Sequence, residues 1–360
     1  MSIEKSNILF SLRPVKILFP ILIGLGFVVF MLVREFEPGF FSFFRFSWHM
    51  VLWLFVAVLF MFGRDFGYII RLRILTDHKL SWLQSFRVIM LWEFTSAVTP
   101  SAIGGTSVAI LYVNKEGITI GKSSATVMAT SFLDELYFIL MFPVLLAVVG
   151  AGALFDYKGD ETIFNLWNNE LFYFAAIGYA IKIVYLMVLS YGLFINPRGL
   201  KWLLLMIFKL PVLRKWKQGA NRAGTDIIKN SVELKHKPLV FWFKAFLSTF
   251  LSWTSRYFVV NAILIAFFFN ADQLLIFARQ LVMWIMMLVS PTPGGSGFAE
   301  FVFTRFLSEF IHHKAFSVTA IAMGLALIWR LISYYPYLFI GAIILPRWIK
   351  KHFVHRHKTS

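Results

Sequence analysis

Long runs of apolar residues, separated by short clusters of charge, dominate the chain. A membrane-spanning helix needs about 20 mostly apolar residues to cross about 30 Å of hydrocarbon. By that measure we expect spans at residues 17–33, 48–62, 123–149, 171–195, 241–268 and 316–345, of which the second is short but extendable. The pattern predicts an all-α polytopic membrane protein with about six spanning helices.

Two further apolar runs are each interrupted by a short segment rich in proline and glycine. We refer to each of these two segments as a knot, meaning a cluster of helix-breaking residues and not a topological knot. The first knot, residues 99–107, reads TPSAIGGTS and interrupts the run 82–113. The second knot, residues 290–297, reads SPTPGGSG and interrupts the run 274–310. Proline removes a backbone donor and glycine weakens a helix, so we expect each knot to break its helix. Inside a membrane a broken helix is tolerated only where protein or a water-filled cavity surrounds it.

The charges of the connecting segments predict the orientation. Residues 64–79, 196–240 and 351–360 are basic, which places them in the cytoplasm by the positive-inside rule. The segment 156–170 is acidic, and we expect it outside. Both termini are then cytoplasmic, with residues 351–360 forming a basic tail.

The termini and loops fall on their predicted sides of the membrane if each knot is the tip of a re-entrant helical hairpin. The first hairpin would enter from the cytoplasm and the second from outside, so that the halves 1–150 and 171–350 form inverted repeats within one domain, 1–350. Secondary transporters built in this way bind their substrate near the midplane. The alternative is that both stretches are ordinary spanning pairs kinked by proline, which is frequent in membrane helices.

Composition narrows the class of protein. The chain is 59% hydrophobic, against about 45–50% in soluble domains, which indicates an integral membrane protein. Its net charge of +17 lies between the apolar runs, where it orients helices and meets anionic lipids, so we expect no nucleic-acid partner. There is no cysteine, and no Walker, HExxH or GxSxG motif occurs. We therefore predict no catalytic residues, no metal and no cofactor.

Ionisable residues inside apolar runs are costly and mark candidate sites. They are Glu93, Asp134, Glu135, Lys182, Arg256, Arg279, Glu300, Arg305 and Arg330. In one interpretation Arg279 and Arg330 bind a lipid phosphate through the planar guanidinium, and carboxylates bind an amine head group or a coupling proton. In the other, Glu93, Asp134 or Glu135 pairs with Arg279 or Arg330 and only locks the bundle.

The knots can add backbone donors to such a site. Amides at the start of a half-helix bind anions, and glycines there allow close approach, although they can also serve the turn alone. The predicted substrate-binding residues are Glu93, Pro100, Gly104, Gly105, Thr106, Arg279, Pro293, Gly294, Gly295, Gly297, Glu300 and Arg330.

Three stretches carry a family resemblance: TPSAIGGTSVAILYVNKEGITIGKSSATVMATSFLDELYF, PTPGGSGFAE and WRLISYYPYLFIGA. With the hydropathy between them, the chain resembles the transmembrane region of the lysylphosphatidylglycerol synthase family, which comprises flippase-like membrane proteins. Members fused to a soluble aminoacyl-transferase domain are thought to move their lipid product between leaflets. Because this chain ends at Ser360, we expect no such domain and no synthase activity. Many relatives have a Glu and then an Arg shortly after the first Gly-rich break, where this chain has Thr106, Ser107, Val108 and Ala109.

The resemblance and the knots together predict a lipid flippase of the bacterial cytoplasmic (inner) membrane. It would move a phospholipid or a lipid-linked glycan, with anionic or zwitterionic lipids as partners, as a monomer or a homo-oligomer. One alternative is a non-transporting subunit whose basic loop, 196–240, docks a lipid-synthesising enzyme. Another is a lipid-modifying enzyme with Glu93 and Glu300 as acid and base.

Overall fold

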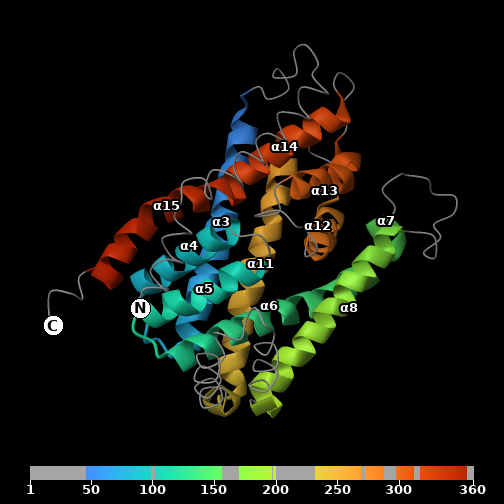
Figure 1. The fold of residues 1–360 in the computed structure, drawn as a ribbon. Helices are drawn as coiled ribbons and strands as arrows, with labels where there is room; N and C mark the ends of the chain where they lie inside the picture. The colour runs from blue at the N-terminus through green and yellow to red at the C-terminus, as the bar shows by residue number, and fades with distance from the viewer. Residues whose placement is uncertain are drawn as a thin grey trace, which may run out of the picture.

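The computed structural model describes residues 46–98, 102–155, 170–196, 198–199, 232–268, 272–287, 297–311 and 317–354. Within these ranges every regular element is a helix, so the all-α prediction is confirmed for this part of the chain. Two long helices, α3 (Trp48–Leu75) and α11 (Leu239–Phe267), run side by side through the middle of the molecule (Figure 1). The other helices are arranged around this central pair.

Small residues let the two central helices approach closely. A Cβ atom added to Gly67 of α3 would lie 2.7 Å from the backbone oxygen of Ser248 and 2.3 Å from Oγ of Ser252, both on α11. One turn earlier, a Cβ on Gly63 would lie 3.1 Å from Oγ of Ser255. The Ser252 hydroxyl also donates to the backbone oxygen of Arg64, at 3.0 Å. Because lipid supplies no hydrophobic force between helices, such close packing is what stabilises the pair.

The first half of the chain continues after α3 with a pair of short helices and three further elements. These are α4 (Trp82–Val98), α5 (Ala102–Lys115), α6 (Ile120–Val149), α7 (Ala151–Phe155) and α8 (Glu170–Ser190), which ends in a π-helical turn, Tyr191–Ile195. Helix α6 ends at Gly150, whose φ of 85° is a left-handed conformation that glycine adopts without strain.

The second half repeats the order of a long helix followed by a pair of short ones. After α11 come α12 (Gln273–Met287), α13 (Phe298–Leu307) with a 3-10 turn at Ser308–Phe310, α14 (Val318–Ser333), and α15 (Tyr335–Ile349) with a π-helical turn at Lys350–Val354. The carboxylate of Asp272 caps α12 by accepting from the amides of Leu274 and Leu275, both at 3.0 Å.

Within the described ranges, five helical segments are long and apolar enough to cross a membrane: Trp48–Leu75, Ile120–Val149, Phe172–Ile195, Leu239–Phe267 and Val318–His352. The predicted span 17–33 lies outside those ranges. The four helices that flank the knots are shorter. Helix α4 has 17 residues, α5 has 14, α12 has 15 and α13 has 10, so at about 1.5 Å per residue none reaches about 30 Å.

The second predicted span, residues 48–62, is shorter than the helix that contains it. Helix α3 continues to Leu75 and includes Arg64 and Arg71, so most of the segment 64–79 is helix rather than loop. Both arginines are buried, with 1% and 4% of their surface exposed. Carboxylate partners on other helices, described below, allow the helix to carry these charges through the packed interior.

The last predicted span, 316–345, is two helices instead of one. Helix α14 ends at Ser333, and Tyr334 adopts φ −129° and ψ −56° before α15 begins. Pro336 lies in the first turn of α15, where its missing N–H does no harm, whereas inside a continuous helix its ring would clash with the preceding turn. We refer to Arg330–Tyr334 as the α14–α15 joint.

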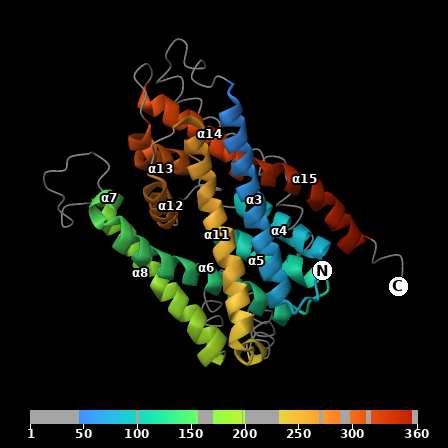
Figure 2. The same cartoon turned by 180° about the vertical axis from the view of Figure 1, so that it is seen from behind.

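Each short helix pair packs against helices of the opposite half. Helix α4 packs against α15 as well as against α5, and α12 packs against α6, α7 and α8 as well as against α11. From behind, α4 and α5 lie on one side of the central pair, and α12 and α13 lie on the other (Figure 2).

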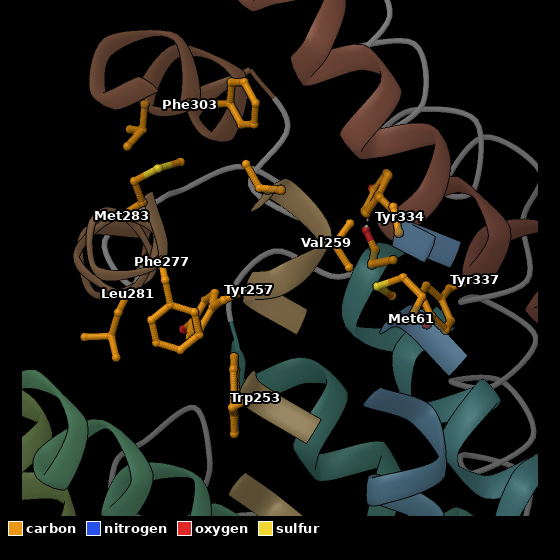
Figure 3. Packing of buried hydrophobic residues seen from close by; sticks show 14 of the residues in the cluster. Met61, Trp253, Tyr257, Val259, Phe277, Leu281, Met283, Phe303, Tyr334 and Tyr337 are labelled. Atoms are coloured by element: carbon orange, nitrogen blue, oxygen red, sulfur yellow. Dashed lines mark hydrogen bonds between the residues drawn. The ribbon is translucent and has the colours of Figure 1, made fainter. Parts of the chain in front are cut away.

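Aromatic residues fill the interface between α11 and α12. Phe277 of α12 lies beside Tyr257 of α11 (Figure 3), and the two rings meet edge to face with centroids 5.5 Å apart. Trp253 lies one turn along α11 from Tyr257. This side of the core is therefore closed by large rings, in contrast to the small residues between α3 and α11.

Candidate functional site

The two arms of the first hairpin, α4 and α5, touch close to the first knot. A Cβ atom on Gly105 would lie 2.0 Å from Oγ and 3.0 Å from Cα of Ser96, so only glycine allows this approach. Further from the knot, the hydroxyls of Thr95 and Tyr112 share a hydrogen bond of 2.7 Å. Thr106, which follows Gly105, is half-buried. These contacts hold the arms together without any charge.

Glu93, on the arm that enters the first knot, belongs to a charged cluster of three helices. Its carboxylate lies 2.5 Å from the guanidinium of Arg64 on α3, which also pairs with Asp65 at 2.9 Å. The hydroxyl of Tyr337 on α15 donates to the Asp65 carboxylate at 2.8 Å. Paired in this way, the three charges can remain ionised away from water.

The exit of the second knot carries a second buried pair. Gly297, with φ 83°, precedes α13, and its amide donates to the Glu300 carboxylate at 2.7 Å, which satisfies one free amide of the helix end. The other carboxylate oxygen of Glu300 accepts from Nε of Arg330 on α14, at 2.8 Å. The side chains of Glu300 and Arg330 are 3% and 5% exposed. A charged residue of α14 is thus fixed at the start of the half-helix that follows the knot.

Arg279, on the arm that enters the second knot, is anchored at the far end of α13. Its guanidinium pairs with Glu309 at 2.8 Å and donates to the backbone oxygen of Phe306 at 2.9 Å. It also donates to the backbone oxygen of Ala153 on α7, at 2.7 Å. This arginine joins both arms of the second hairpin to the first half of the chain.

The α14–α15 joint contacts the surroundings of both knots. At one end Arg330 binds Glu300, directly after the second knot. At the other end, the Tyr334 hydroxyl donates to the backbone oxygen of Ala97, directly before the first knot, at 3.1 Å. Two sequence knots nearly 200 positions apart are therefore linked through one short stretch of chain.

Three of the other predicted ionisable residues, Asp134, Glu135 and Lys182, form structural pairs elsewhere. Asp134 pairs with Arg71 at 2.5 Å and accepts from the indole of Trp253 at 2.7 Å. Glu135 pairs with Lys182 of α8 at 3.0 Å. Because each acid meets its base on a different helix, these pairs fix α3, α6, α8 and α11 relative to one another.

The predicted residues fall into three groups. Glu300 and Arg330 are in direct contact, and Glu93 and Arg279 lie in separate ion pairs. Gly105 and Thr106 belong to the first knot but lie in helix α5, and Gly297 is the last residue of the second knot. Gly104 lies in the first turn of α5. Pro100, Pro293, Gly294 and Gly295 lie outside the described residues.

The pairing proposed as the alternative to lipid binding was wrong in its partners. Glu93, Asp134 and Glu135 bind Arg64, Arg71 and Lys182, rather than Arg279 or Arg330. Arg64 and Arg71 were missed as interior residues because they follow a run of apolar residues and look like the start of a loop. Their spacing of about two helical turns, which places both on one helix face, was the available signal.

Comparison with known proteins identifies the family. The family model of the lysylphosphatidylglycerol synthase TM region matches residues 17–341, and the chain therefore belongs to this family. A relative from Archaeoglobus fulgidus, described as a UPF0104 membrane protein, is 26% identical over 321 residues, which cover 85% of this chain and 90% of the relative. No solved structure matches the chain. The protein is an integral membrane protein, in agreement with the prediction from composition.

Proposed function

We propose that this chain moves a phospholipid or a lipid-linked glycan between membrane leaflets, along a path between the two hairpins. A head group can cross the bilayer only through a polar route, while its acyl chains remain in lipid. Helices that break inside protein expose backbone donors and acceptors at the required depth, and such helices form the substrate sites of many transporters.

The observation that carries this proposal is the α14–α15 joint. It binds the exit of the second knot through Arg330 and the entrance of the first knot through Tyr334. One short stretch of chain thus contacts a residue beside each knot, which supports a central substrate site at this region. We infer that both hairpins are re-entrant and that their tips approach each other at this region.

A lipid-leaflet assay tests the function. The purified protein is reconstituted into vesicles that contain a phospholipid with a fluorescent head group, and a membrane-impermeant quencher is added outside. Movement between leaflets raises the quenched fraction above about half, the share of the outer leaflet. We expect this rise with the wild-type protein and a slower rise with Tyr334→Phe, which loses the hydrogen bond to Ala97.

Ser333→Ala is the matched control, because the Ser333 hydroxyl donates to Trp329 within its own helix, at 2.7 Å. This variant should move lipid at the wild-type rate. Vesicles in which correctly folded wild-type protein moves none of a panel of phospholipids and lipid-linked sugars would contradict the proposal and would favour a subunit that only presents lipid.

Cross-linking tests the geometry separately. The chain contains no cysteine, so Thr106→Cys and Ser296→Cys introduce two unique thiols, one in each knot. If the tips meet, a short bifunctional thiol reagent should join them. The pair Lys244→Cys and Thr106→Cys serves as a control that should not react. A folded double variant that no short reagent cross-links would contradict the convergence of the tips.

A further inference from the structure

One interior cation differs from the rest in its partners. Arg64, Arg71, Lys182, Arg279 and Arg330 each bind a carboxylate. Arg256 of α11 forms no ion pair within the part of the chain that the structure describes. Glu93 acts on it electrostatically, but that carboxylate is bound to Arg64. A half-buried guanidinium that forms no ion pair with a described carboxylate is energetically costly inside a membrane protein, and such residues are rare.

Aromatic rings hold Arg256 in place. Its guanidinium carbon lies 4.2 Å from the ring centroid of Trp284 on α12 and 5.3 Å from that of Trp253 on α11. Stacking of this kind uses the flat face of the guanidinium. Among the described residues no hydrogen bond or ion pair engages the N–H donors of Arg256, so an acceptor can bind them.

Arg256 lines a narrow crevice between α11, α12 and α14, which is partly open to the surroundings and has a cavity volume of only about 20 Å³. Its walls include Tyr257 and Val260 of α11, Met283 and Trp284 of α12, and Trp329 of α14. The lining is apolar apart from a few polar groups, which is the usual character of a small-molecule site.

A second polar group in the crevice also has no partner. The Tyr257 side chain is 3% exposed, and its hydroxyl makes no hydrogen bond within the described part of the chain. Buried hydroxyls without a hydrogen-bond partner are rare unless a ligand or water completes them. Arg256 and Tyr257 are neighbours on α11, and both residues line the crevice.

We propose that this crevice binds the phosphodiester of an anionic phospholipid, with Arg256 as the charge partner and the Tyr257 hydroxyl as a second donor. The proposal rests on the function proposed above and names its substrate class. Both groups can donate hydrogen bonds, so the ligand must carry acceptors, and the fixed positive charge of Arg256 selects an anion. The methionine and tryptophan walls suit the glycerol and upper acyl region of a lipid.

The crevice borders the hairpins. Met287, the last residue of α12 before the second knot, also lines it, and Trp329 precedes Arg330 of the α14–α15 joint. Arg256 lies about 17 Å along α11 from the end of that helix, well inside the bundle. A head group held here would be next to the exit of the second knot, where Arg330 is the next cation.

Lipid-dependent thermal stabilisation in a neutral detergent tests the site. Short-chain phosphatidylglycerol, which is anionic, is titrated against phosphatidylcholine with the same chains. We expect phosphatidylglycerol to raise the unfolding temperature of the wild-type protein at lower concentration. Arg256→Gln should weaken this effect at least about tenfold, since a charged hydrogen bond contributes about 1.5–3 kcal/mol. Arg256→Lys should retain part of it, and Tyr257→Phe should weaken it less than Arg256→Gln.

Lys244→Gln is the matched control, because it removes one positive charge from the exposed part of the same helix. It should bind phosphatidylglycerol as the wild type does. Equal preference for phosphatidylglycerol in Arg256→Gln, Tyr257→Phe and the wild type would overturn the proposal. A soluble glycerophosphodiester at the same concentration should give a smaller shift, and an equal shift would reject a lipid as the ligand.

The two proposals fail in different ways. If the wild-type protein moves lipid in vesicles but Arg256→Gln keeps its preference for phosphatidylglycerol, the assignment of this site is wrong and the transport function stands. If Arg256→Gln loses the preference while no lipid moves in wild-type vesicles, the anion site is supported and the transport function is wrong.

Discussion

The two hairpins differ in the forces that hold them beside their knots. Within the first knot, Gly105 packs directly on Ser96. The ion pairs of that hairpin, Glu93 with Arg64 and Arg87 with Glu116, lie farther along its arms. Next to the second knot, Glu300 is joined to a separate helix by its ion pair with Arg330. Close packing cannot loosen without loss of contact along the whole interface, whereas an ion pair can exchange one anion for another.

This difference assigns different roles to the hairpins. We infer that the first hairpin is the more rigid of the two. At the second, a lipid phosphate could replace the Glu300 carboxylate on Arg330 without unfolding any element. The crevice at Arg256 lies on the same side of the molecule, against α12 and α14. If the proposed function is right, we therefore expect substrate binding around the second hairpin.

Removal of the Arg330 charge should have the largest effect. Arg330→Gln leaves Glu300 buried without its cation, and we expect a loss of about 3 kcal/mol in the free energy of unfolding, moderated by the hydrogen bond that Gly297 retains. The double variant with Glu300→Gln should recover most of that loss. Denaturation of the purified variants measures both.

Transport by the double variant then separates structure from binding. If Arg330 serves only Glu300, the stable double variant should move lipid at the wild-type rate. If Arg330 also binds phosphate, the double variant should be stable and slow. A single variant as stable as the wild type would contradict the buried pair itself.

A side chain at position 105 should have the second-largest effect on the stability of the fold. Gly105→Ala places a Cβ atom 2.0 Å from the Ser96 hydroxyl, so the arms of the first hairpin must separate, at about 2 kcal/mol. Ser96→Gly in the same chain should relieve most of this strain, and thermal unfolding measures the recovery. Gly105→Ala with an unchanged unfolding temperature would show that the first hairpin is the looser one.

Loss of the hydrogen bond within the first hairpin should have a smaller effect. Thr95→Val removes the partner of the buried Tyr112 hydroxyl and should cost about 1 kcal/mol. Adding Tyr112→Phe removes the stranded hydroxyl and should reduce the cost. If the two single variants and the double variant are simply additive in denaturation, the pair does not couple the arms.

The smallest effect is expected far from both hairpins, at the turn after α3. Burial alone would raise the pKa of Asp77, but hydrogen bonds and charges from Lys122 and Lys237, at 2.5 and 2.6 Å, outweigh it and lower the pKa below its ordinary value of 3.8. Because the folded pKa is the lower one, the ionised group stabilises the fold above pH 3.8, and this contribution is lost as the pH falls through the folded pKa.

Asp77→Asn should therefore be slightly less stable than the wild type at pH 7, and the difference should shrink as the pH falls below 3.8. Asparagine tolerates the positive φ of 54° at this position, so backbone strain should not add to the effect. Unfolding temperatures of both proteins over a pH series provide the measurement. A difference that widens at low pH would contradict the assigned direction of the pKa.

The hydropathy of the chain predicted the helices well wherever the need to satisfy backbone hydrogen bonds in lipid determines the structure. Helix α4 lies at the predicted residues, and α6 and α12 begin and end within about a turn of the prediction. Long apolar runs must be helical in lipid, because every backbone polar group has to be satisfied within its own segment. The all-helical class, the membrane location and the family therefore followed from the sequence.

Hydropathy did not predict how far the helix extends at charged residues, nor which helices meet at small residues. Arg64 and Arg71 read as the end of a helix, yet they lie inside one, since Glu93 and Asp134 on other helices neutralise them. The glycines of α3 gave no sign of their partners on α11, because close approach depends on the facing surface. A charge pattern identifies candidates for a site, but it cannot tell which of them meet.

The sequence by itself determined that the helices break at two knots and that charge is placed inside the membrane. The tertiary structure alone decided that Arg330 meets Glu300, that Tyr334 reaches the other knot, and that Arg256 faces a crevice beside an unpartnered hydroxyl. The reason is physical. The cost of a charge or of a broken helix in lipid is a local property of the chain, whereas the partner that offsets this cost lies on a helix distant in sequence.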